Sequence, residues 1–125
     1  MSKKNKKNFS SDRLQQKCFM YAWNKYPQTR GLLWHTPNGG KRNAIEAKRF
    51  KDIGVIAGIP DLFFLWKGKL YGFEVKVTGD RQSEAQKEIE AKLKANGAEY
   101  YIVKNTPDKF VEVFDEIMKK NIDVC

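Results

Sequence analysis

Three residues near the middle of the chain combine side-chain types that cleave phosphodiesters with the help of a metal ion. Asp61 follows Pro60, and Glu74 and Lys76 lie on either side of Val75. Two carboxylates held close together repel each other unless a cation lies between them, and an oxygen-only ligand set with spare positions suits Mg²⁺. A lysine beside that ion would stabilise the charge that develops on an attacked phosphate. The combination therefore indicates metal-assisted phosphodiester hydrolysis.

The spacing predicts that these residues share one face of a β-hairpin. Two strands joined by a tight glycine turn are expected over about 61–66 and 70–77. Because side chains alternate along a strand, Glu74 and Lys76 point to the same side. A two-residue turn that begins at Lys67 places Asp61 opposite Glu74. One that begins at Gly68 places it opposite Lys76, and a three-residue loop would send Asp61 to the other face. We favour a two-residue turn, since Gly68 supplies the positive φ that such turns need.

Each part of this pattern also has an ordinary structural explanation. A Glu-x-Lys triplet is expected about once by chance in a chain so rich in both residues, and a motif of that kind is weak when it stands alone. Aspartate after proline is common turn chemistry, and a strand face of Glu and Lys can simply be solvated. The combination of spacing, strand placement and topology favours the functional interpretation.

Apolar spacing and capping residues predict the elements around the hairpin. Helices are expected to begin at Ser10 or Ser11, to cover about 43–53 and 83–96, and to follow Thr106-Pro107-Asp108. Further strands are expected over 31–35 and 98–103. The order is α-β-α-β-β-α-β-α, and the last strand follows a crossover helix, so it should pair in parallel. We therefore predict an α/β fold with a mixed four-stranded sheet flanked by helices.

Composition and charge indicate a polyanionic partner. The chain has 125 residues, with 24 Lys and Arg against 15 Asp and Glu, a net charge of +9. That exceeds the magnitude of about 2–8 that solubility asks of a small domain, so nucleic acid is expected ahead of a membrane surface. Two cysteines and one histidine are too few for zinc fingers or zinc deaminases.

The length suggests a single folded unit. Residues 1–9 contain four lysines and little to bury, so we expect a disordered basic arm, followed by one domain over 10–125. The composition of the arm fits a solubilising tail and a phosphate-binding segment equally well. The sequence has neither a membrane-spanning apolar stretch nor the hydrophobic region of a signal peptide. A cytoplasmic protein that encounters DNA inside the cell is therefore the expectation.

The tryptophans and the single histidine are expected to serve the fold. Trp23, Trp34 and Trp66 fall on apolar patterns and are expected in the core. His35 ends a predicted strand and has no second histidine as a partner, so we assign it a structural role.

The motifs and their order resemble a known family. Pro60-Asp61 followed by Glu74-Val75-Lys76 resembles the PD-(D/E)XK signature of restriction-endonuclease-like nucleases, and the surrounding sequence is closer to their virus-type replication-repair nuclease (VRR-NUC) branch. The matching stretches are 37–42, 54–62, 72–76 and 83–86, and the likeness covers about 12–104. It implies a restriction-endonuclease-like fold and a nuclease that depends on Mg²⁺ or Mn²⁺.

The resemblance also assigns roles to individual residues. It implies that Asp61, Glu74 and the main-chain carbonyl of Val75 hold the ion and that Lys76 aids the nucleophilic water. It further implies a catalytic role for Gln86, although Ser83-x-x-Gln86 is also a capping box, in which the glutamine binds the N-cap amide.

One position departs from the family pattern. The family usually has a Glu on its first helix as a further acidic group at the metal, and Asp12 lies there. Its shorter side chain is expected to reach the ion through water, or to serve only the helix dipole. Glu46 on the second predicted helix is a weaker candidate for the same position.

The expected partner is DNA. Lys41 and Arg42, after a turn that contains Asn38, would present two cations and backbone amides to a phosphate. The resemblance implies a homodimer that acts on branched DNA such as four-way (Holliday) junctions, and a dimer would bring two sites to two strands. The alternatives are a non-catalytic nucleic-acid-binding module and a nuclease that prefers RNA or single strands.

Overall fold

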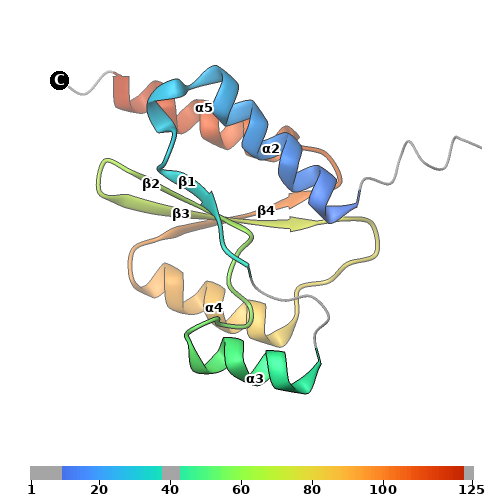
Figure 1. Ribbon diagram of the computed structural model, residues 1–125. Coiled ribbons are helices and arrows are strands. Elements are labelled where there is room, and N and C mark those ends of the chain that lie inside the picture. Colours follow the sequence, from blue (N-terminus) through green and yellow to red (C-terminus); the bar gives the residue numbers. More distant parts are fainter. Residues whose placement is uncertain (1–9, 38–42, 123–125) are drawn as a thin grey trace, which may run out of the picture.

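The computed structural model of the protein describes residues 10–37 and 43–122 (Figure 1). The helices are α2 (Ser11–Lys25), α3 (Ala44–Asp52), α4 (Glu84–Ala95) and α5 (Asp108–Ile122), with a short 3₁₀ helix η1 (Pro27–Thr29). The strands are β1 (Leu33–His35), β2 (Leu62–Trp66), β3 (Lys69–Lys76) and β4 (Glu99–Lys104).

The strands form one mixed sheet in the order β1-β2-β3-β4. The pairs β1–β2 and β2–β3 are antiparallel, whereas β3 and β4 run parallel because α4 carries the chain back between them. The predicted fold class and element order are therefore confirmed.

Side-chain caps set the starts of the helices where the sequence predicts them. Ser10 Oγ accepts a hydrogen bond from the Arg13 main-chain N–H at 3.1 Å, and Asn43 Oδ1 accepts one from Glu46 N–H at 2.8 Å. The first strand is shorter than expected, because Leu32 N–H donates to the Thr29 carbonyl and completes a turn before β1 begins.

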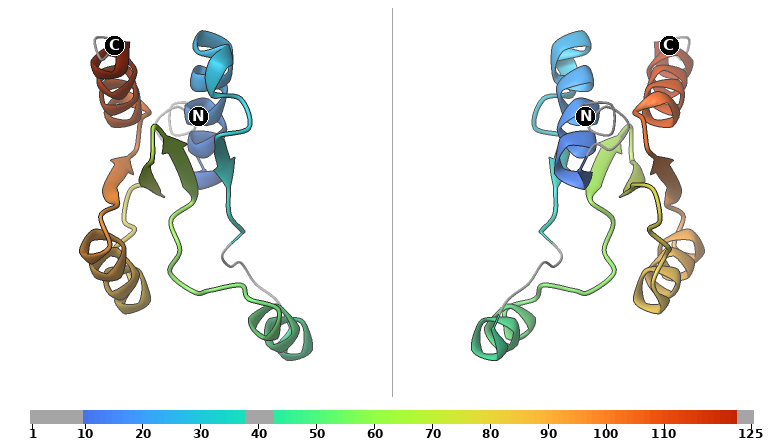
Figure 2. Two further views of the ribbon diagram at one scale, coloured as in Figure 1. Left: turned by 90° about the vertical axis from the view of Figure 1, so that its left-hand side faces the viewer. Right: turned by 90° about the vertical axis from the view of Figure 1, so that its right-hand side faces the viewer.

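The helices lie on both sides of the sheet. Helices α2 and α5 cover one face, and α4 lies beyond the other (Figure 1). Helix α3 stands apart from both the sheet and α4 (Figure 2). No residue of α3 is buried, and Ile45 on it is 81% exposed.

Aromatic rings form the centre of the core between the sheet and the helices α2 and α5. Phe64 and Phe73 project from the sheet, and Phe110 and Phe114 project from α5; all four are fully buried. The ring centroids are 4.4 Å apart for Phe64–Phe114 and 4.8 Å apart for Phe73–Phe110. This packing fixes the faces of β2 and β3, and therefore which side chains remain for the opposite face.

The expectation that the tryptophans lie in the core is wrong for two of them. Trp23 and Trp34 are each 39% exposed. Trp34 alternates to the outer side of β1, where it packs against Phe63 with centroids 6.0 Å apart. Arg30 covers Trp23, with its guanidinium carbon 4.7 Å from the ring centroid. Trp66 is partly buried and packs against the core.

Residues 1–9, 38–42 and 123–125 lie outside the described residues. The basic arm proposed for 1–9 therefore stays a prediction. Among the described helices, none is long and apolar enough to span a bilayer.

Candidate active site

The turn of the hairpin sets the register of the predicted site residues. Trp66 pairs with Lys69, which leaves Lys67 and Gly68 as a two-residue turn with φ angles of 51° and 81°. Positive φ at both positions belongs to the type I′ turn, whose twist matches the flanking strands. Continued one residue beyond β2, this register places Asp61 opposite Glu74. The favoured two-residue turn is confirmed, in the first of its two registers.

The side chain of Asp61 is anchored across the hairpin to β3, and its main chain is anchored to the end of β1. Its Oδ2 atom accepts a hydrogen bond from the Val75 N–H at 2.7 Å. Its carbonyl accepts from the Thr36 N–H at 3.1 Å and from His35 Nδ1 at 2.8 Å. Because a carbonyl only accepts, Nδ1 of His35 must carry the proton. The histidine therefore has a structural role, as predicted, and holds the segment that bears Asp61.

Glu74 is an acid buried in the sheet. Its side chain is 1% exposed, and its Oε1 accepts a hydrogen bond from the Tyr100 hydroxyl. Its Oε2 has no hydrogen-bond partner among the described residues and lies 3.4 Å from Lys76 Nζ. Burial raises the pKa of Glu74 and the nearby Asp61 raises it further, whereas Lys76 and the Gln82 side chain both lower it. A buried carboxylate with one unsatisfied oxygen requires a cationic neighbour.

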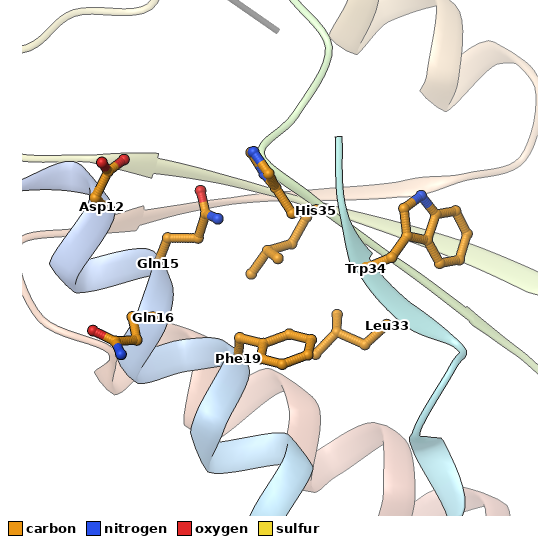
Figure 3. A pocket seen from close by; sticks show the side chains of 8 residues that line it. Asp12, Gln15, Gln16, Phe19, Leu33, Trp34 and His35 are labelled. Atoms are coloured by element: carbon orange, nitrogen blue, oxygen red, sulfur yellow. The ribbon is translucent and has the colours of Figure 1, made fainter. Parts of the chain in front are cut away.

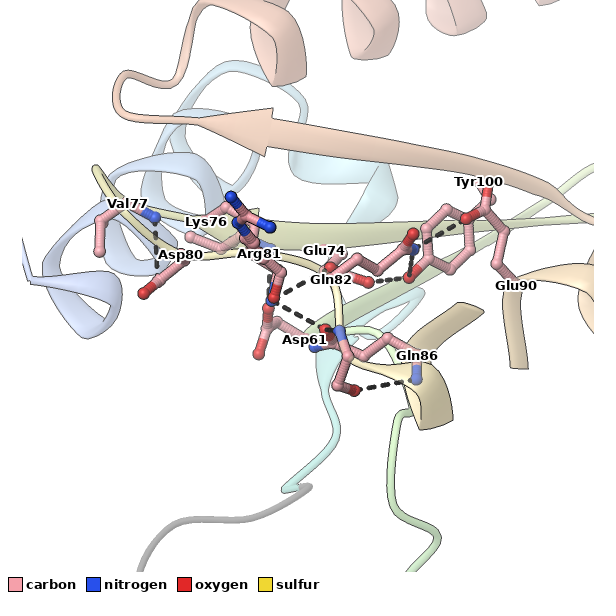
Figure 4. A network of polar contacts seen from close by, with 12 residues as sticks. Asp61, Glu74, Lys76, Val77, Asp80, Arg81, Gln82, Gln86, Glu90 and Tyr100 are labelled. Carbon is pink, nitrogen blue, oxygen red and sulfur yellow. Dashed lines mark hydrogen bonds and ion pairs between the residues drawn. The ribbon is translucent and has the colours of Figure 1, made fainter. Parts of the chain in front are cut away.

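Lys76 joins this acid to the start of α4. Its side chain is 12% exposed. Its Nζ donates to Gln86 Oε1 at 2.8 Å and to the Arg81 carbonyl at 3.0 Å (Figure 4). These two acceptors and Glu74 hold the ammonium in one position.

Gln86 serves as both a helix cap and a partner of the lysine. Its Oε1 accepts from the Ser83 N–H at 2.8 Å, and its own N–H donates to Ser83 Oγ at 3.1 Å, so the capping box is present. The same Oε1 accepts from Lys76 Nζ. The two interpretations of Gln86 therefore do not exclude each other.

A glycine permits the close approach that brings the Asp61 loop to α4. A Cβ atom on Gly58 would lie 2.5 Å from the Ala85 carbonyl oxygen and 2.9 Å from the Gln86 main-chain nitrogen. Its φ of +89° also favours glycine. Only glycine fits here, so the loop leading to Asp61 is fixed against the helix that carries Gln86.

Comparison with known proteins identifies the fold. No family model and no curated protein sequence matches the chain. A solved structure described as "VRR_NUC domain protein" is similar, with a TM-score of 0.71, 24% identity and 89% of each chain covered. The protein has the VRR-NUC fold. The fold expected from the motifs is thus observed over most of the chain.

The carboxylates on this VRR-NUC sheet fit a divalent ion. Glu74 contributes a buried oxygen without a hydrogen-bond partner, and Asp61 is close enough to raise its pKa. The Val75 N–H points to Asp61. Because the N–H and C=O of any strand residue point to the same side of the strand, the Val75 carbonyl also points toward Asp61. Two carboxylates and a carbonyl are oxygen ligands of the kind that Mg²⁺ and Mn²⁺ take.

Among the described residues, no third acidic side chain is grouped with Asp61 and Glu74 as a metal ligand. Within residues 10–37 and 43–122, no three His, Cys, Asp or Glu side chains are grouped as a metal site. Asp12 is exposed and lines a cavity of about 400 Å³ between α2 and β1, with Gln15 on its own helix and His35 across from it (Figure 3). Glu46 is exposed in the first turn of α3. A role for either acid at the ion stays a prediction.

Tyr100 and Gln82 also lie at the candidate site, although no motif in the sequence predicts them there. Tyr100 donates to Glu74, and Gln82 Nε2 is 3.4 Å from the Tyr100 hydroxyl. No local signal marks Tyr100, because its place beside Glu74 depends on the parallel register of β3 and β4, which pairs Gly72 with Tyr100. The predicted DNA contacts Asn38, Lys41 and Arg42 lie outside the described residues.

Proposed function

We propose that the protein is a divalent-metal-dependent nuclease that hydrolyses phosphodiester bonds in DNA. The observation that carries the proposal is the position of the Lys76 ammonium, 3.4 Å from Glu74 Oε2 and bound to Gln86. A lysine on an ordinary solvated strand face would keep its ammonium in water, whereas that of Lys76 is largely withdrawn from water between a buried acid and a helix cap. This arrangement is suited to stabilising charge on a phosphate.

Three groups are proposed to hold the ion: the carboxylates of Asp61 and Glu74 and the main-chain carbonyl of Val75. When bound, Mg²⁺ or Mn²⁺ polarises a phosphate oxygen and acidifies a water. The hydrogen bond from the Val75 N–H leaves the Asp61 carboxylate in a fixed orientation before substrate arrives.

Lys76 and Gln86 are proposed to act on the attacking water and the phosphate. The ammonium stabilises negative charge on the pentavalent transition state and orients the nucleophile. Gln86 Oε1 and the Arg81 carbonyl each accept a hydrogen bond from the ammonium, and these two bonds orient its remaining N–H. Gln86 therefore positions Lys76 even without touching the substrate.

The proposed substrate is branched DNA, such as a four-way junction, cut by a homodimer. The net charge of +9 supports a polyanion, with Lys41 and Arg42 as proposed phosphate contacts. One site cuts one strand, and a two-fold dimer presents two sites to two strands. Size-exclusion chromatography with light scattering tests the dimer. A mass near twice 14.5 kDa is expected, and a monomer at the concentration used for cleavage would contradict the dimer.

A cleavage panel tests the nuclease proposal. Linear, nicked, flap and four-way-junction DNA, with matched RNA, are incubated with the protein in Mg²⁺, Mn²⁺ or EDTA. We expect cleavage of a branched DNA with either metal and none in EDTA. Metal-independent, salt-sensitive binding without cleavage in any arm would favour a non-catalytic binding module. Preferential cleavage of RNA or single strands would correct the substrate.

A further inference from the structure

Tyr100 contacts the buried acid of the site directly. Its hydroxyl donates to Glu74 Oε1, and its side chain is 7% exposed. A phenol is a neutral donor, so this contact satisfies one carboxylate oxygen without neutralising the acid. The other oxygen, Oε2, faces Lys76 at 3.4 Å.

A chain of polar contacts continues from Tyr100 to the surface of α4. Gln82 Nε2 lies 3.4 Å from the Tyr100 hydroxyl and donates to Glu90 Oε1 at 2.8 Å (Figure 4). Glu90 Oε2 in turn pairs with Lys94 Nζ at 2.7 Å. The Gln82 amide nitrogen therefore donates toward Glu90 and the Tyr100 oxygen. The one O–H of Tyr100 then donates its hydrogen bond to Glu74.

We propose that Tyr100 is a positioning residue that occupies Glu74 Oε1 and leaves Oε2 as the oxygen offered to the metal ion, with Gln82 as its support. The inference rests on the nuclease proposal above. A carboxylate whose two oxygens both lack hydrogen bonds can rotate, or can bind an ion through both oxygens. In Glu74, the Tyr100 hydroxyl already occupies Oε1. Contacts that orient a ligand in this way typically change metal affinity by about 10–100-fold when they are removed.

The adjacent tyrosine provides a matched control. Tyr101 is the next residue of β4, and its hydroxyl also donates to a glutamate, Glu99. It points to the opposite face of the sheet, where its ring stacks on Phe73. Tyr101→Phe therefore removes the same chemical group from the same strand without touching Glu74.

The test measures Mn²⁺ binding by the full chain without DNA, using the electron paramagnetic resonance signal of free Mn²⁺. We expect Tyr100→Phe to weaken Mn²⁺ binding by about 10-fold and Tyr101→Phe to change it by less than about twofold. Gln82→Ala should weaken binding in the same direction but by less. High Mn²⁺ should restore the cleavage rate of Tyr100→Phe, which damage to the fold would not allow.

Reference variants separate the two proposals. Asp61→Asn should abolish Mn²⁺ binding. If it does and Tyr100→Phe binds Mn²⁺ like the unmodified protein, the role of Tyr100 is wrong and the metal site stands. If the unmodified protein binds no Mn²⁺, or Asp61→Asn binds it equally well, the proposed metal site is wrong, and the proposed role of Tyr100 is wrong as well. Thermal unfolding checks each variant, and Gln82→Ala provides the test should Tyr100→Phe fail to fold.

Discussion

The main-chain N–H of Val75 donates a hydrogen bond to Asp61 Oδ2 at 2.7 Å, across the open end of the hairpin. Val75 is the residue between Glu74 and Lys76, so this bond ties the Asp61 carboxylate to the strand segment that carries the other two groups. The turn at the far end of the hairpin sets the register, and this contact fixes the side chain within it.

Asp61→Asn should remove activity and leave the fold intact. The amide oxygen of asparagine still accepts from the Val75 N–H, but the charge that holds a cation is lost. We expect cleavage to fall by about 100-fold or more, with unchanged circular dichroism and an unfolding midpoint close to that of the unmodified protein. Substantial activity in Asp61→Asn would remove this residue from the site.

Lys76→Ala should be inactive for a reason distinct from net charge. Lys104 is its register partner on β4 and is exposed. Lys104→Ala is therefore the control. Lys76→Ala and Lys104→Ala each lower the net charge by one, so both should weaken DNA binding slightly and similarly. Only Lys76→Ala should lose cleavage, by about 100-fold in kcat. Equal losses in both variants would mean that the lysine acts only by attracting DNA.

Gln86→Ala and Ser83→Ala separate capping from catalysis. Each removes one half of the capping box, and each should lower the free energy of unfolding by about 1 kcal/mol. Gln86→Ala also removes an acceptor of Lys76 Nζ, so we expect it alone to lower kcat, by about 10-fold. Chemical denaturation and single-turnover cleavage are the measurements. If both variants cleave at the same rate, Gln86 is only a cap.

Gly58→Ala should displace the Asp61 loop from α4, whereas Gly54→Ala should not. Both glycines have positive φ, at +89° and +105°, so both substitutions cost about 1 kcal/mol in backbone strain. A Cβ on Gly54 meets nothing within 4 Å among the described residues, whereas one on Gly58 meets the Ala85 carbonyl. We expect cleavage to fall by about 10–100-fold in Gly58→Ala only, because a shift of about 1 Å misplaces the reacting groups.

Asp115 should stabilise the fold only while it is ionised. It accepts from Tyr21 at 2.7 and 2.8 Å and from Tyr26 at 2.6 Å, and so joins α5 to α2. Burial alone would raise the pKa of Asp115, but these two hydroxyls and Lys25 lower it by more. A pKa lowered by folding gives stability that is present above the unfolded-state pKa and is lost as the pH falls through the folded-state pKa.

Asp115→Asn should therefore be less stable at pH 7 by about 1 kcal/mol, a value kept small because the side chain is partly exposed. The difference from the unmodified protein should shrink as the pH falls below about 4. Urea denaturation across this range measures it, with Glu116→Gln as the control, since that exposed acid is the next residue of α5. A difference that does not change with pH would contradict the assignment.

Local sequence determined most of the fold and the placement of Glu74 and Lys76 in the candidate site. Ser10, Asn43 and Ser83 cap helices through groups three residues away, and Gly68 sets a turn between adjacent strands. Interactions over so few residues can be predicted because the chain geometry leaves few alternatives. The alternation of β3 then places Glu74 and Lys76 together on one face.

Only the tertiary structure decided how distant segments meet. The parallel register of β3 and β4 brings Tyr100 to Glu74, and the packing of the Asp61 loop on α4 makes Gly58 irreplaceable while Gly54 has space. A crossover helix permits several registers, since its length does not fix the pairing as a two-residue turn does. The choice among them comes from burying the aromatic core, which depends on all the elements at once.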